Sequence, residues 1–304
     1  MVKRKRRRLK KSVKTIFSLL IVVFILSIVY LSTDKKDPVK VMKTETPRVL
    51  KKKKEKKNID EDSFMVSCKK LNYCKEEFED RYKKYKEEHS NLSIEDIVTY
   101  VNLNLDYSFY TNTEKTPILN KETMLVNKYL YLDSDYVPDN LESIPSEYSR
   151  SGMKLVKVAK DKFVEMSKAA KKDGYSVIAM SSYRSYKYQV NLYNRYVKSD
   201  GVNGADTYSA RAGFSEHQTG LCVDVYDGKI DYTNFEKSKS FNWMNDNAYK
   251  YGFILRFPKD KENITGYQYE SWHYRYVGEE IAKYIHENNI TFEEYYVRFI
   301  EPTI

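Results

Sequence analysis

Apolar residues recur at helical spacing in one long stretch of the chain, and a strand-like apolar run follows it directly. Three- and four-residue steps predict a helix over residues 151–172, built on Leu155, Val156, Ala159, Phe163, Met166 and Ala170. Asp173-Gly174 is the stop signal for that helix. The run Val177-Ile178-Ala179-Met180 then predicts a buried strand over 175–181. Arg184 falls just past this strand, where a fixed backbone can present a polar side chain to open space.

Further strands and helices follow. A second helix starts after Ser182 and ends at Gly201, and residues 240–251 and 278–289 also have helical patterns. Strands are predicted over 252–258 and 267–277, and over 221–226, where alternation separates Leu221, Val223 and Val225 from Cys222, Asp224 and Tyr226. The main domain is expected to begin with an extended lead-in near Leu125. Helices over 76–89 and 93–105, the second with Ser93 and Asp96 as a capping box, form a helical segment over 61–124 ahead of it.

The first sixty residues have a different pattern. Nine Lys or Arg residues lie in 1–14, and an uncharged apolar run at 16–31 is able to cross most of a bilayer core as a helix. Because no small-residue cleavage site follows the run, we expect a single-pass signal anchor over 15–32 rather than a cleaved signal peptide. The excess of basic residues before the run keeps the amino terminus in the cytoplasm and places the rest outside the cell. The Lys-rich segment 33–60 is expected to be a disordered linker.

The net charge of +10 is concentrated in the amino-terminal segment. Residues 1–57 hold 20 of the 53 Lys and Arg residues but only 4 of the 43 Asp and Glu residues, which leaves the remainder mildly acidic. A mildly acidic folded part does not have the basic surface of a nucleic-acid-binding protein. The basic tail is expected to act as an electrostatic tether to anionic lipid or polymer.

Two short segments contain the residues best suited to chemistry. Two of the four histidines, His217 and His273, lie in Ser-Glu-His-Gln-Thr-Gly-Leu-Cys-Val-Asp (215–224) and Glu-Ser-Trp-His (270–273). Two imidazoles, a carboxylate at a fixed offset from the first and a second carboxylate beside the other form the ligand set of a catalytic zinc site with its general base. Glu270 and His273 point oppositely in a flat strand, so a bend or bulge must bring both toward the metal.

The remaining cysteines and histidines have weaker signals. Cys68 and Cys74 form either a small disulfide or two unpaired thiols, and the spacing leaves both open. Cys222 is interpreted as a small buried apolar residue, because a thiolate would complete a closed structural site. His89 lies in a charged run and is expected to be solvated, and His286 is expected to have a surface or supporting position.

At these motifs the chain resembles the VanY-type D-alanyl-D-alanine carboxypeptidases, zinc peptidases of the bacterial cell wall that share a fold with the hedgehog signalling domain. The resemblance covers about 125–289 and rests on Ser-Tyr-Arg-Ser (182–185), the 215–224 segment, Gly-Phe-Ile-Leu-Arg-Phe-Pro (252–258) and Glu-Ser-Trp-His. It implies an α+β fold with a mainly antiparallel sheet and flanking helices. It also implies the following roles: zinc ligands His217, Asp224 and His273, catalytic residues Glu270 and Arg184, and substrate-binding residues Ser215, Gln189, Tyr183 and Trp272. Cys222 stands where the resemblance suggests a small residue.

The resemblance therefore predicts an enzyme that removes the terminal D-alanine from peptidoglycan stem peptides, with Glu270 taking a proton from water activated at the zinc. A D-Ala-D-Ala dipeptidase or a peptidoglycan endopeptidase of the same fold is the alternative within the enzymes. A non-catalytic wall-binding module is the alternative outside them, although such a module has no need of Glu270. The sequence leaves open the bond that is cut, D,D- or L,D-, and the oligomeric state.

Overall fold

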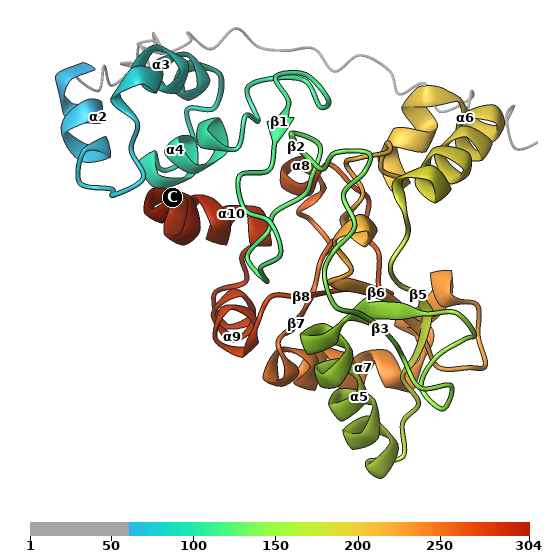
Figure 1. Cartoon of the computed structure of the whole chain (residues 1–304). Coiled ribbons are helices and arrows are strands. Elements are labelled where there is room, and N and C mark those ends of the chain that lie inside the picture. Colours follow the sequence, from blue (N-terminus) through green and yellow to red (C-terminus); the bar gives the residue numbers. More distant parts are fainter. Residues whose placement is uncertain (1–60) are drawn as a thin grey trace, which may run out of the picture. The chain divides into compact units, whose positions relative to one another are not determined.

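The computed structural model describes residues 61–304, shown in colour in Figure 1. The predicted basic tail (1–14), membrane anchor (15–32) and linker (33–60) lie outside the described residues. Within 61–304, no helix combines the length and the apolar character needed to cross a bilayer.

A four-stranded antiparallel sheet lies at the centre of the main domain. Its strands are β5 (Ile178–Ser181), β6 (Cys222–Tyr226), β7 (Phe253–Leu255) and β8 (His273–Tyr276), arranged in the order β5-β6-β8-β7. Every neighbouring pair in this sheet is antiparallel. The α+β fold expected from the sequence is therefore confirmed.

Strand alternation gives this sheet one apolar and one polar face. Helices α5 (Lys157–Lys172), α7 (Lys239–Asn247) and α9 (Glu279–Asn288) contribute to a single apolar core with the first face. That core includes Val223, Val225, Tyr274, Phe253 and Tyr276 from the strands, Phe163 and Met166 from α5, Met244 from α7 and Ile285 from α9. Burying these side chains is the main stabilising contribution available to the domain.

The opposite face has polar residues in register across β6 and β8. Asp224 lies directly opposite His273, and Cys222 lies opposite Arg275. Arg256 continues the row, because its backbone N–H donates to the carbonyl of His273 at 3.1 Å. The alternation predicted over 221–226 is confirmed, and it places the polar residues of both strands on one side of the sheet.

Two connections deliver further residues to this polar face. Helix α6 (Tyr186–Tyr208) begins directly after β5, where the Ser185 hydroxyl caps it by accepting from the Tyr188 N–H, and Gly201 interrupts its helical geometry with a φ of 71°. A 3-10 turn, η2 (Glu216–Thr219), precedes β6 and ends at Gly220, whose φ of 67° is in the left-handed region that favours glycine. The short turn lets His217 and Asp224 approach the same point from either side of Gly220.

The remaining elements are short. They are α2 (Glu61–Cys68), η1 (Glu76–Phe78), α3 (Glu79–Glu88), α4 (Ile94–Asn102), β1 (Glu114–Lys115), β2 (Leu130–Tyr131), β3 (Leu141–Ser143), β4 (Lys154–Val156), η3 (Tyr232–Lys237), η4 (Ala248–Tyr251), α8 (Glu262–Thr265), α10 (Phe292–Tyr295), the π-helical turn η5 (Tyr296–Ile300) and η6 (Glu301–Thr303). Strands β1 and β2 pair in parallel, and β3 and β4 pair antiparallel.

Helices α2, α3 and α4 have an apolar cluster of their own, which includes Phe64, Tyr82, Ile97, Val98 and Val101. The capping box predicted for α4 is confirmed in its first half: the Ser93 hydroxyl accepts from the Asp96 N–H at 3.0 Å, and the Asp96 carboxylate accepts from the Ser93 hydroxyl at 2.7 Å. Arg298 of η5 joins α4 to the C-terminal turns by donating to the Thr99 hydroxyl at 3.0 Å and to the Asp96 carboxylate at 3.3 Å.

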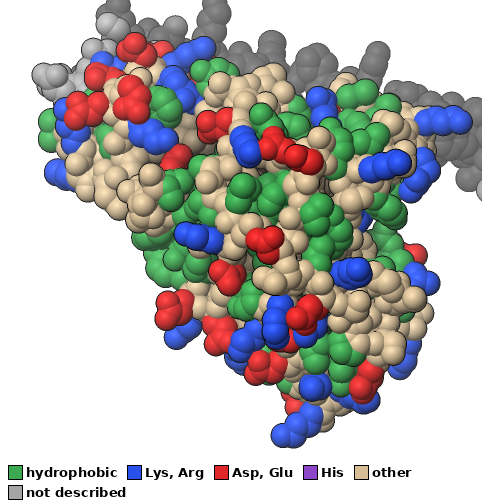
Figure 2. All heavy atoms as spheres, in the orientation of Figure 1, with side chains coloured by type: hydrophobic (Ala, Val, Ile, Leu, Met, Phe, Trp, Pro, Cys, Tyr) green, Lys and Arg blue, Asp and Glu red, His purple; other side chains and the backbone are tan. Residues whose placement is uncertain are grey.

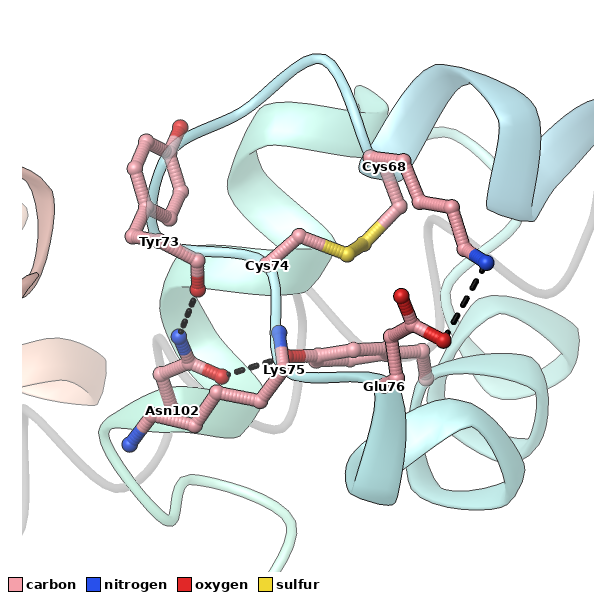
Figure 3. The surroundings of a disulfide bond; sticks show 8 residues. Cys68, Tyr73, Cys74, Lys75, Glu76 and Asn102 are labelled. Carbon is pink, nitrogen blue, oxygen red and sulfur yellow. Dashed lines mark hydrogen bonds and ion pairs between the residues drawn. A yellow bond between two sulfur atoms is a disulfide. The ribbon is translucent and has the colours of Figure 1, made fainter.

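A disulfide joins Cys68 at the end of α2 to Cys74, which decides between the two states that the sequence left open (Figure 3). Beside it, the Asn102 amide of α4 donates to the carbonyl of Tyr73 at 2.7 Å and accepts from the Tyr82 hydroxyl at 2.6 Å. The disulfide loop is therefore held against both α3 and α4.

Several predicted boundaries are wrong: β5 begins at Ile178 rather than at 175, and α6 continues beyond the kink at Gly201 to Tyr208. Two further differences have identifiable reasons. The helix expected over 151–172 begins only at Lys157, because Gly152 has a φ of 84° and Lys154–Val156 pairs with β3. The strand expected over 267–277 begins only at His273, because residues 270–273 form a turn in which the His273 N–H approaches the Glu270 carbonyl at 3.4 Å. This turn, rather than a bulge, provides the bend between Glu270 and His273 that the sequence required.

Charged side chains of both signs are interspersed over the face drawn in Figure 2, with no large area of one sign. That distribution agrees with the mildly acidic composition of the chain beyond residue 57. It differs from the basic surface that duplex or single-stranded nucleic acid requires.

The disulfide gives a stability prediction. Replacing Cys68 and Cys74 together by Ala should lower the free energy of unfolding by about 2 kcal/mol, the loop-closure entropy for so short a loop. Denaturant unfolding followed by circular dichroism measures the change. As a control, a thiol-specific reagent should label one cysteine of the unfolded wild-type chain before reduction and three after reduction, because Cys222 alone is free among the described cysteines. Three reactive thiols before reduction would contradict the disulfide.

Candidate active site

Each imidazole of the polar face is fixed by a hydrogen bond through one ring nitrogen, Nδ1 in His217 and Nε2 in His273. His217 Nδ1 lies 2.7 Å from the carbonyl oxygen of Ser182, and His273 Nε2 lies 3.2 Å from a carboxylate oxygen of Glu216. A carbonyl and a carboxylate only accept, so Nδ1 of His217 and Nε2 of His273 carry the protons and donate. Nε2 of His217 and Nδ1 of His273 are left with the lone pairs that ligate metals.

Those two free nitrogens converge on Asp224. His217 Nε2 lies 3.4 Å from Asp224 Oδ2, and His273 Nδ1 lies 3.1 Å from Asp224 Oδ1. Asp224 Oδ1 is nevertheless buried without a hydrogen-bond partner among the described residues, so the atoms are close without being aligned as donor and acceptor. Ligand atoms about 2.0–2.2 Å from one tetrahedral ion lie roughly 3.3–3.6 Å apart. The three side chains therefore fit a single divalent metal ion.

Glu270 lies beside this group and is nearly fully buried at 7% exposure. One of its carboxylate oxygens is 3.7 Å from His273 Nδ1, and its backbone N–H is anchored at 3.1 Å on the carbonyl of Phe257. Burial raises the pKa of Glu270 to about 7, and the nearby Asp224 carboxylate adds to this effect. A carboxyl group with this pKa can both accept and return a proton near neutral pH.

Arg184 is the cationic residue of the site. Its backbone N–H donates to the His217 carbonyl at 3.2 Å, which fixes the residue between β5 and α6. Its side-chain Nε is buried without a hydrogen-bond partner among the described residues. A guanidinium group with unused donors beside a cleft is suited to bind a carboxylate or a developing oxyanion.

These residues open onto a cleft of about 410 Å³. Among the predicted site residues, the lining includes Arg184, Ser215, His217, Asp224, Glu270, Trp272 and His273. Two predicted substrate-binding residues, Tyr183 and Gln189, are not part of it. The Gln189 amide is 1% exposed and donates to the Ala210 carbonyl at 2.8 Å, so its position braces the loop before Ser215.

A buried ion network under His273 was missed from the sequence. Glu216 accepts from Arg256 at 2.8 Å and from Arg275 at 2.7 Å with the oxygen that does not face His273. Arg256 also forms a two-bond pair with Glu293 of α10 at 2.6 and 2.8 Å. Against the effect of burial, the two guanidinium groups hold the pKa of Glu216 well below its usual range. Glu216 is therefore a fixed carboxylate that orients the His273 ring.

Part of this network had a signal in the sequence. Strand alternation from His273 predicts that Arg275 lies on the same face, and Arg256 belongs to the strand motif 252–258. Glu293 had none, because its partner is 37 residues away and no short motif contains it. The two other histidines match their expected positions in part: His286 is exposed and stacks on Tyr249, whereas His89 is half-buried against Tyr85.

The role of Glu216 can be tested through the metal. Replacing Glu216 by Gln leaves one acceptor oxygen for Arg256, Arg275 and His273 Nε2–H, which now share two, so we expect metal affinity to fall about 10- to 100-fold. Equilibrium dialysis against a buffered metal series measures this loss. The variant should also be less stable, because two buried guanidinium groups lose their shared carboxylate.

Replacement of Glu293 by Gln is the matched control. It removes the other carboxylate of Arg256 but leaves the contact between Glu216 and His273, so stability should fall while metal affinity is kept. Equal losses of metal affinity in the two variants would show that the network acts on the metal site only through stability.

Comparison with known proteins agrees with this geometry. The family model described as VanY, D-alanyl-D-alanine carboxypeptidase, matches residues 152–279. The carboxypeptidase-like protein YodJ of Bacillus subtilis (strain 168) is 42% identical over 188 residues, which cover 57% of this chain and 66% of YodJ, just under two thirds of its length.

Two solved structures are similar over the same region. The LD-carboxypeptidase LdcB, whose structure concerns peptidoglycan recognition, is 42% identical with a TM-score of 0.53, and the match covers 57% of this chain and 85% of that one. A mutant of the vancomycin-resistance D,D-pentapeptidase VanY in complex with Zn(II) is 32% identical with a TM-score of 0.50, covering 57% of this chain and 98% of that one. With the fold, the convergent site and these matches in agreement, the chain belongs to the VanY family of D-alanyl-D-alanine carboxypeptidases.

Proposed function

We propose that this protein is a zinc carboxypeptidase that removes the C-terminal D-alanine from peptidoglycan stem peptides. The observation that supports this most strongly is the convergence of His217 Nε2, Asp224 and His273 Nδ1 beside Glu270, within one cleft. The similar VanY structure contains Zn(II), and two nitrogen ligands with one carboxylate are a common ligand set of catalytic zinc. A zinc ion bound there would supply Lewis acidity and lower the pKa of water.

The residues of the chain supply the remaining chemistry. Glu270 takes a proton from the attacking water and returns it to the amine of the leaving D-alanine. Arg184 faces the cleft with unused donors and binds the free carboxylate at the end of the peptide. The half-buried Trp272, held edge-to-face against Tyr232 at a centroid distance of 5.4 Å, supplies an apolar wall for the peptide.

One observation favours L,D-carboxypeptidase activity as a second candidate specificity. LdcB, an LD-carboxypeptidase, is more similar in both sequence and structure than the D,D-pentapeptidase VanY. The full-length zinc-loaded protein should therefore be incubated separately with a stem pentapeptide and a stem tetrapeptide, and products identified by mass. Loss of one D-alanine from the pentapeptide supports D,D-cleavage, and loss of one from the tetrapeptide supports L,D-cleavage. Release of a dipeptide, or cleavage inside the stem, would instead favour the dipeptidase or the endopeptidase alternative.

We further propose that residues 15–32 anchor the protein in the cell membrane and that the domain acts outside the cell. The apolar run, its basic amino-terminal flank and the cell-wall substrate support this arrangement. The disulfide between Cys68 and Cys74 adds support, because disulfides persist mainly in exported proteins.

The assignment of Glu270 as the general base gives a direct prediction. Glu270→Gln should bind zinc with the wild-type stoichiometry but release D-alanine at least about 100-fold more slowly, since the amide cannot accept the proton. Metal content by atomic emission and product release by mass spectrometry are measured on the same sample. Turnover within a few-fold of wild type would remove Glu270 from this role and favour a binding function for the cleft.

The assignment of Arg184 concerns recognition of the peptide end. Arg184→Lys keeps the charge but loses the paired N–H geometry, so kcat/KM should fall about 10- to 100-fold. A substrate amidated at its C-terminus provides the matched comparison. If Arg184 binds the carboxylate, wild type should strongly prefer the free acid and the variant should lose much of that preference; an unchanged preference would assign the carboxylate to another group.

A further inference from the structure

Cys222 is a second type of ligand atom on the polar face of the sheet. It lies on β6 two residues before Asp224, opposite Arg275 of β8, and is 0% exposed. Unlike Cys68 and Cys74, it is a free thiol. Strand alternation directs its side chain to the same side as Asp224 and His273.

This thiol is close to both imidazoles of the candidate metal site. The Cys222 sulfur and one ring nitrogen each of His217 and His273 lie within 4.8 Å of one another, and all three residues are buried. Asp224 Oδ1 beside them is buried and has no hydrogen-bond partner among the described residues. The thiol and the two imidazoles thus form one group of potential ligands from η2, β6 and β8, and the unpartnered Asp224 oxygen next to it, 3.1 Å from His273 Nδ1, indicates a place suited to a cation.

The thiol approaches from a different side than the substrate. His217, Asp224, Glu270 and His273 all line the cleft, whereas Cys222 does not. Cys222 therefore lies behind the other ligands, toward the sheet. A ligand in this position leaves the cleft side free, so an ion held by four protein ligands would still have room there for water as a fifth ligand.

We propose that Cys222 is a fourth protein ligand of the metal ion, bound as the thiolate from the sheet side. The inference rests on the proposed function only in sharing its metal site. Binding forms a sulfur–metal bond and releases the thiol proton to solvent, so the charge of the ion is balanced by Cys222 as well as Asp224. A soft anionic ligand strengthens the hold on zinc and weakens its Lewis acidity. The chain thereby favours metal retention over maximal turnover.

Cobalt(II) absorption tests the ligand directly, without any assay of hydrolysis. The full-length protein is freed of metal, loaded with Co²⁺ alone and scanned through the near ultraviolet and the visible. We expect a sulfur-to-cobalt charge-transfer band in addition to the visible bands of bound cobalt. The Cys68→Ala, Cys74→Ala double variant should keep the charge-transfer band, which leaves Cys222 as its source.

Two substitutions at Cys222 complete the experiment. Cys222→Ala and Cys222→Ser should lose the charge-transfer band, keep the visible bands and bind the metal at least about 10-fold more weakly.

The two possible failures are distinguishable. Visible cobalt bands without a charge-transfer band in wild type would overturn the role of Cys222 and leave the proposed function intact, whether or not the variants fold. Failure of wild type to bind Co²⁺ or Zn²⁺ at all would reject the metal site itself, and the proposed function with it.

Discussion

The opposition of Asp224 and His273 across β6 and β8 is the contact on which the site depends. Antiparallel pairing fixes their separation, and alternation puts them on the face that helices α5, α7 and α9 do not cover. A register slip of one residue would place Val223 or Val225 where Asp224 now lies and expose the apolar face. Burial of the core therefore also enforces the position of the ligands.

The second constraint is the fixed proton on each imidazole. The Ser182 carbonyl and the Glu216 carboxylate each accept from one ring nitrogen, so the other nitrogen of each ring faces Asp224. Glu216 is itself fixed by Arg256 and Arg275, and Arg256 extends the network to Glu293 in α10. Buried charges without partners are costly, so this network has few alternative arrangements. A segment about twenty residues after His273 in the sequence thus helps to orient a candidate metal ligand.

Much of the site could be predicted because its residues lie in short segments where strand alternation and motif spacing determine the direction of the side chains. Alternation over 221–226 placed Asp224 on the polar face, and the Glu-x-x-His spacing required the bend that residues 270–273 form. The start of β8 and of α5 could not be predicted, since both depend on pairing with distant strands. Glu293 and the internal position of Gln189 follow from tertiary packing alone, and no periodicity in the chain reports on them.

The position of Cys222 shows how the same alternation can be interpreted in two ways. A buried small residue and a metal ligand have the same pattern on a strand, and only the neighbouring elements separate them. Here η2 and β8 bring two imidazoles to the thiol, whereas the cleft remains on the other side.

The central claim is that a single metal ion lies between His217, Asp224 and His273, and anomalous diffraction from a zinc-loaded crystal tests it most directly. One peak should lie about 2.0–2.2 Å from His217 Nε2, an Asp224 oxygen and His273 Nδ1. A zinc peak elsewhere, or coordination through His217 Nδ1 or His273 Nε2, would contradict the account.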